Sequence, residues 1–184
     1  MTTLESAVDD TRRWLERAVV GLNLCPFAKA VVVKQQVHFA ATDAEDAAGI
    51  LAAFAQELEA LAQSDPGERD TTLLVVPRGM EDFLAFLDLV ARAERLVRKR
   101  GLEGVLQVAH FHPDFVFADS DEDEITNYTN RSPHPVLHLL SEESIDRAVA
   151  AFPDAAAIYE ANMQRLQELG HAGWEALGVG PTKP

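Results

Sequence analysis

The only cysteine of the chain, Cys25, lies in a segment that could form a nucleophilic site, Gly-Leu-Asn-Leu-Cys-Pro-Phe-Ala-Lys over residues 21–29. Pro26 favours the first position of a helix and would place Cys25 at the N-cap. Free amides and the helix dipole stabilise a thiolate there, and Lys29, one turn later, adds positive charge for a substrate. The segment therefore predicts a nucleophilic or metal-binding thiol. The alternative is a buried cysteine that packs as a small hydrophobe.

Two histidines and a carboxylate follow at the end of an expected strand, in the sequence Ala-His-Phe-His-Pro-Asp over 109–114. On an extended strand His110 and His112 project to the same face, and Asp114 follows them if the strand continues. Imidazole and carboxylate groups at this spacing are typical ligands of a divalent metal such as zinc. The alternative is a strand end that carries half-exposed histidines. His38 and His138 are interpreted as ordinary strand residues.

A polar loop begins at Asn127 with the sequence Asn-Tyr-Thr-Asn-Arg-Ser-Pro-His-Pro. Arg131 could clamp a carboxylate or phosphate through two branches of its guanidinium, with Thr129 and Ser132 as further substrate contacts. Asn127 or Asn130 could orient a catalytic imidazole. The alternative is that these side chains hydrogen-bond the backbone of their own loop.

These segments indicate two classes of function. The first is an enzyme of the hydrolase or transferase type, with Cys25 as the nucleophile and His112 as the general base. Its substrate would be a small anion held by Arg131, and the asparagine that orients the imidazole would be Asn127 or Asn130. The second class binds a metal or a small ligand without catalysis, through Cys25, His112 and Asp114, with His110 as a further candidate metal ligand. A third class is an interaction module, such as a homo-oligomer, in which the polar loop is only structural.

The elements that must position these residues alternate along the chain. β-Branched and apolar runs predict four strands, at 31–40, 71–77, 105–111 and 135–140. Apolar residues at helical spacing predict helices before, between and after them. We therefore expect a single α/β domain over residues 1–170, with a mainly parallel or mixed sheet of about four strands covered by helices. The alternative is a ferredoxin-like α+β sandwich, and residues 171–184 are expected to form a loose tail.

The amino-acid composition disfavours some classes of binding partner. The chain has 184 residues, is 47% hydrophobic, and carries a formal net charge of −14. This negative charge disfavours nucleic acids and anionic membranes as partners, so a small-molecule ligand is the expected one. One cysteine excludes an internal disulfide, and no nucleotide-binding motif is present. Without a signal-like or bilayer-length apolar stretch, the sequence predicts a cytoplasmic protein.

Several motifs occur in order along the chain: GLNLCPFAKAV, FHPDFVFA, TNYTNRSPHPVLHLL and IYEANMQRLQELG. Together they resemble one uncharacterised bacterial family, the domain-of-unknown-function family 1415, over a range from Trp14 to about Gly173. The resemblance implies a single-domain protein with no assigned reaction. Its identifying motifs coincide with the three polar segments described above, although His110 lies outside the family pattern.

Overall fold

Four strands form one mixed sheet at the centre of the molecule, in the order β1-β2-β4-β3. The computed structural model describes residues 3–152 and 154–182. The strands are β1 (Val37–Ala41), β2 (Thr71–Val75), β3 (Leu106–Phe111) and β4 (Val136–Ser141). The helices are α1 (Leu4–Trp14), a π-helical turn η1 (Leu15–Val20), α2 (Ala28–Val33), α3 (Ala47–Gln63), α4 (Phe83–Lys99), a 3-10 helix η2 (Ile125–Asn130), α5 (Glu142–Ala151) and α6 (Ala155–Ala176). None of these described helices combines the length and the apolar composition that crossing a lipid bilayer requires.

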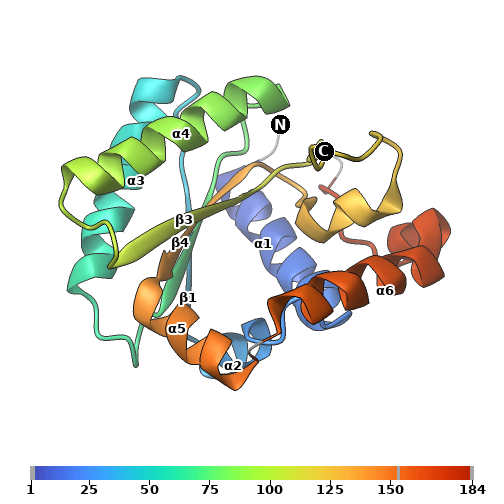
Figure 1. The fold of residues 1–184 in the computed structure, drawn as a ribbon. Helices are drawn as coiled ribbons and strands as arrows, with labels where there is room; N and C mark the ends of the chain where they lie inside the picture. The colour runs from blue at the N-terminus through green and yellow to red at the C-terminus, as the bar shows by residue number, and fades with distance from the viewer. Residues whose placement is uncertain (1–2, 153, 183–184) are drawn as a thin grey trace.

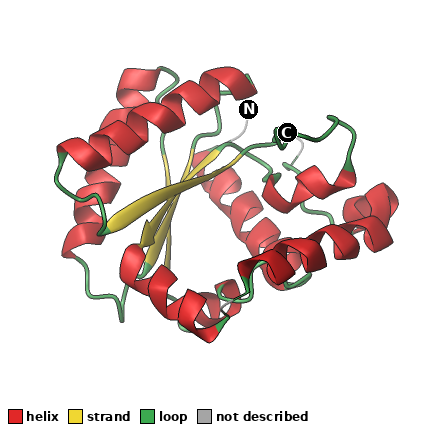
Figure 2. Ribbon diagram, in the orientation of Figure 1, coloured by secondary structure: helices red, strands yellow, loops and turns green. Residues whose placement is uncertain are grey.

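The topology explains why the sheet is mixed. β1 and β2 pair in parallel, because helix α3 carries the chain back between them. β4 is antiparallel to both of its neighbours, β2 and β3, and lies between them. The predicted single α/β domain is therefore confirmed. Helices cover both faces of the sheet, whereas a ferredoxin-like sandwich carries its helices on one face (Figures 1 and 2).

Each face of the sheet has its own hydrophobic core. The first core lies under α3 and α4 and includes Phe54, Phe86 and, from the sheet, Leu137. The second lies under α1, η1 and α6 and includes Trp14 and, from the sheet, Val136. Adjacent residues of β4 thus enter different cores, because side chains alternate across a strand. β2 is buried at every position, as its unbroken apolar run predicts.

The predicted strand at 31–40 is only half right. Its first part is the end of helix α2, and the strand β1 begins at Val37. Gln35 ends the helix with a left-handed backbone, at φ 57°. Val32 packs against the second core from the helix, so tertiary burial outweighs the strand propensity of a β-branched residue.

Residues 171–182 are anchored to the fold at a few points, whereas the sequence predicts a loose tail. Helix α6 bends at Gly170, where φ is 65°, and continues to Ala176. Trp174 and Val179 are buried in the second core. The Thr182 backbone N–H then donates a hydrogen bond to Asp10 at 2.9 Å. Burial of these apolar side chains gives this segment a fixed path despite its glycines and prolines.

Candidate functional site

His112 is a buried structural residue on the side of the first core. It is 0% exposed and packs between the rings of Phe83 and Phe86, with centroids 5.2 and 5.1 Å away. Its Nε2 donates to the Met80 carbonyl at 2.9 Å, and its Nδ1 accepts from the Asp114 backbone N–H at 3.0 Å. Burial lowers the pKa of His112, and the hydrogen bond to Met80 offsets this only in part. Both ring nitrogens are therefore engaged, and neither is free to accept a proton or bind a metal.

Cys25 lies on the other side of the sheet, where it packs against the second core. The structure therefore does not bring Cys25 and His112 together as the nucleophile and base that the sequence analysis expects. The physical reason is strand alternation at the end of β3. Phe111 enters the second core with Cys25, so the next residue, His112, is carried to the opposite face.

The expected helix N-cap at Cys25 is also absent from the structure. Helix α2 begins at Ala28, its N-cap is Phe27, and no side chain caps it. The Cys25 carbonyl instead accepts a hydrogen bond from the Ala28 N–H at 3.2 Å. Lys29 is exposed on the short helix. The local source of thiolate stabilisation that the sequence predicts is therefore not formed.

The expected metal ligands do not converge. His110 is half-buried on the first-core side, with its ring 6.1 Å from Phe86 and 5.8 Å from Phe115. Asp114 is exposed. Within residues 3–152 and 154–182, no three His, Cys, Asp or Glu side chains are grouped so that they could hold an ion. The four residues predicted as zinc ligands, Cys25, His110, His112 and Asp114, therefore do not form one site.

Asn127 and Arg131 organise the acidic loop that precedes them. Asn127 is 0% exposed, accepts from the Phe117 N–H at 3.0 Å and donates to the Asp121 carbonyl at 2.7 Å. The Arg131 guanidinium donates to the carbonyls of Phe115 and Glu122 at 3.0 and 2.7 Å. Both side chains thus hydrogen-bond the backbone of their own loop, as the alternative interpretation describes.

The remaining polar residues of this loop make similar contacts. Thr129 donates to the Thr126 carbonyl at 3.1 Å, and Ser132 donates to the His134 carbonyl at 2.5 Å. The Asn130 carbonyl accepts from the His112 N–H at 3.2 Å. The alternative interpretation given above, a loop whose side chains hydrogen-bond its own backbone, describes Thr129 and Ser132, whereas Asn130 contributes its backbone carbonyl.

A buried Asp–His pair, which sequence reasoning missed, ties together segments that are far apart in the chain. Asp10 is 0% exposed, and His134 Nε2 donates to its Oδ2 at 3.0 Å. Burial would raise the pKa of Asp10, but hydrogen bonds from Thr182, His134 and Arg13 outweigh it and lower the pKa. The available signal was a carboxylate on the buried face of α1, beside Ala7. We therefore regard this pair as a structural clasp that holds residues 178–182.

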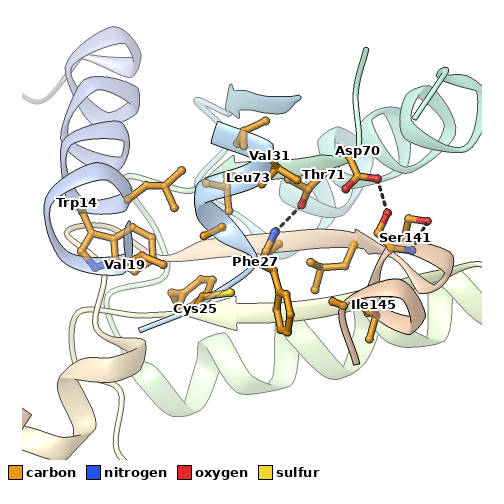
Figure 3. A pocket seen from close by; sticks show the side chains of 18 residues that line it. Trp14, Val19, Cys25, Phe27, Val31, Asp70, Thr71, Leu73, Ser141 and Ile145 are labelled. Atoms are coloured by element: carbon orange, nitrogen blue, oxygen red, sulfur yellow. Dashed lines mark hydrogen bonds between the residues drawn. The ribbon is translucent and has the colours of Figure 1, made fainter. Parts of the chain in front are cut away.

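A cavity of about 170 Å³ lies beside Cys25, between the sheet and the helical elements α1, η1, α2 and α5 (Figure 3). Its wall is mostly apolar, and it includes aromatic rings from three different elements. The residues that line it are Trp14, Leu15, Val19, Cys25, Phe27, Ala28, Val31, Val37, Asp70, Thr71, Leu73, Phe111, His138, Leu140, Ser141, Ser144, Ile145 and Ala148. Of the sequence-predicted site residues, Cys25 is the one that lines this cavity.

The cavity has one polar edge, formed by Asp70, Thr71, His138 and Ser144. The Thr71 hydroxyl donates its single proton to the Leu139 carbonyl at 2.7 Å. His138 Nε2 lies 2.6 Å from the same oxygen; with the Thr71 proton on the Leu139 carbonyl, we assign Nε2 as the donor of this contact. Ser144 donates to the Asp70 carboxylate (Figure 3).

His138 is the polar residue of this wall that the sequence analysis set aside as an ordinary strand residue. It lies on the central strand β4, opposite Leu73 of β2 and Ala109 of β3. Burial lowers its pKa to about 4, so the imidazole is neutral at pH 7. A signal was present in the sequence, because His138 is the polar residue in the apolar run Val-Leu-His-Leu-Leu over 136–140.

Comparison with known proteins identifies a family and no named relative. A family model described as a protein of unknown function (DUF1415) matches residues 6–176. No curated protein and no solved structure matches the chain. The matched range includes every element that lines the cavity, from α1 to α5.

Proposed function

This chain belongs to the DUF1415 family of proteins of unknown function, and we propose from its own geometry that it binds a small, largely apolar molecule without transforming it. The observation that carries this proposal is the apolar cavity beside Cys25. It corresponds to the second class of function inferred from the sequence, a small-ligand protein, but with a cavity in place of a metal centre.

The size of the cavity supports a ligand. Protein interiors are packed as tightly as organic crystals, so large voids are few. The wall of this space of about 170 Å³ is mainly apolar, so burying the apolar surface of a ligand there is favourable. An apolar cavity of about 150 Å³ is large enough for benzene. The cavity therefore fits a single ring or a short branched chain.

The chemistry of the wall supports binding rather than turnover. The Cys25 thiol lines the cavity, but the base expected for it, His112, lies across the sheet. The imidazole that does line the cavity, His138, has its Nε2 committed to Thr71. An apolar wall with few polar groups is typical of a site that recognises shape.

Thermal unfolding with benzene tests the proposal. A fragment held with a Kd near 1 mM stabilises the fold by about 1.4 kcal/mol at about 10 mM, which raises Tm by about 3–6 °C. We expect this rise in the wild type. Ala148→Leu, which fills the cavity, should abolish it, whereas Ala150→Leu, at an exposed position of the same helix, should retain it. An absent rise in the wild type, or an equal rise in Ala148→Leu, would contradict ligand binding in this cavity.

A further inference from the structure

The charge of the cavity wall limits the ligand. Among the described residues that line it, none is Lys or Arg, and the charged one is Asp70. A carboxylate or phosphate moved into this space would lose its hydration and find no cation to replace it. The predicted anion contacts, Lys29 and Arg131, lie outside the lining. Asp70 is in turn engaged by Ser144 and lies 3.9 Å from Arg147, so it offers little to a cation, and the molecule that fits best is neutral.

Most polar atoms of the wall are already engaged. The Thr71 hydroxyl donates to Leu139, and the Ser144 hydroxyl donates to Asp70. Trp14 Nε1 has no hydrogen-bond partner among the described residues, but it is fully buried, so it is not exposed to a ligand in the cavity. These groups provide rigidity rather than recognition.

Two acceptors of the wall have no hydrogen-bond partner among the described residues, the second oxygen of Asp70 and His138 Nδ1, and the His138 ring lies beside the aromatic part of the wall, 5.8 Å from Phe111. Because Nε2 carries the proton that is donated to Thr71, Nδ1 of the neutral ring is an acceptor. Within the described residues Nδ1 has no hydrogen-bond partner. The His138 side chain lines the cavity, so its ring is within reach of a molecule bound there.

The apolar part of the wall favours an aromatic ring. Trp14 and Phe111 meet edge to face with centroids 5.0 Å apart, and Phe111 lies 5.8 Å from the His138 ring. Phe27, which precedes helix α2, also lines the cavity (Figure 3). Rings arranged edge to face around a space of this size present complementary edges and faces to a further ring.

Resting on the binding function proposed above, we infer that the ligand is a hydroxylated aromatic molecule of the phenol class, whose hydroxyl donates a hydrogen bond to His138 Nδ1. The aromatic ring occupies the space among Trp14, Phe27 and Phe111. The hydroxyl meets the polar edge, where the acceptor is otherwise unused.

Calorimetric titration with phenol, toluene and benzoate tests this inference. Toluene replaces the hydroxyl by a methyl group of similar size, and benzoate adds a negative charge. In the wild type we expect phenol to bind about 5- to 10-fold more tightly than toluene, because a buried hydrogen bond is gained. We expect benzoate to show no binding. In His138→Leu the order should invert, since a hydroxyl without an acceptor costs more to bury than a methyl group.

The outcomes separate this inference from the proposed function. If toluene and phenol both fail to bind, the cavity is not a binding site and both proposals fail. If toluene binds as tightly as phenol in the wild type, or if benzoate binds comparably, the phenol class is wrong while the cavity remains a binding site. A preference for phenol that survives in His138→Leu would also overturn the assignment.

An NMR measurement on the wild type tests the same hydrogen bond without relying on a variant that could fail to fold. The ¹⁵N chemical shift of His138 Nδ1 in the wild type should move when phenol is added, and should move much less with toluene. Equal displacement by the two ligands would contradict a hydrogen bond to this atom.

Discussion

Replacing His138 by Leu should make the free energy of unfolding fall less when the pH is lowered. Burial moves the pKa of this ring from its ordinary value of 6.5 to about 4 in the folded protein. Between these values the unfolded chain binds a proton that the folded protein does not, so stability rises with pH and falls as pH decreases from 6.5 towards 4. In His138→Leu this contribution is absent.

The size of the effect follows from the pKa difference. At about 1.4 kcal/mol per pKa unit, His138 costs the wild type up to about 3 kcal/mol once the pH has fallen below both values. Most of this, about 2.5 kcal/mol, is already lost between about pH 7.5 and about pH 4.5. Burial also lowers the pKa of other histidines, including His38, His110 and His112, which therefore add to the acid sensitivity of both proteins equally.

Urea unfolding at the two pH values measures this contribution. The free energy of unfolding of the wild type should fall by about 2.5 kcal/mol more than that of His138→Leu over this interval. Ala150→Leu, which changes no titratable group, should show the wild-type pH dependence. Parallel losses in the wild type and His138→Leu would refute the burial of a neutral imidazole at this position.

Two further predictions concern the clasp and the thiol. Asp10→Ala should lower the free energy of unfolding by about 3 kcal/mol at neutral pH, because it leaves His134 and Thr182 without their shared partner. The pKa of Asp10 is lowered, so its contribution is lost as pH falls below the ordinary value of 3.8, and urea unfolding should show the two proteins converging there. If the unfolding free energies of the wild type and Asp10→Ala differ as much below pH 3.8 as at neutral pH, the Asp10 carboxylate is not ionised in the fold. Alkylation of Cys25 by iodoacetamide, followed by mass spectrometry, should slow at saturating toluene, since the thiol lines the occupied cavity. A rate that toluene leaves unchanged would place the ligand elsewhere.

Local sequence signals were sufficient for most elements of the fold. The unbroken apolar run of β2 and the amphipathic patterns of α3 and α4 depend on neighbours a few residues away, so the strand at 71–77 and a helix on each side of it agree with the structure. Ser141 also caps α5 as its position before an acidic turn indicates. Val31 and its neighbours did not follow their strand propensity, because contacts with distant residues decided their conformation.

The sequence by itself determined the class of the molecule: an acidic α/β domain of a recognisable family, with four strands in the expected order along the chain. Only the tertiary structure decided which side chains share a site. A one-residue step at the end of β3 sends Phe111 towards Cys25 and His112 to the opposite core. The order of the strands and the side of the sheet that each side chain occupies depend on contacts between distant segments. The residues that share the cavity with Cys25 therefore include residues of α1, β2 and β4, and none from the polar segments at 109–114 and 127–135 except Phe111.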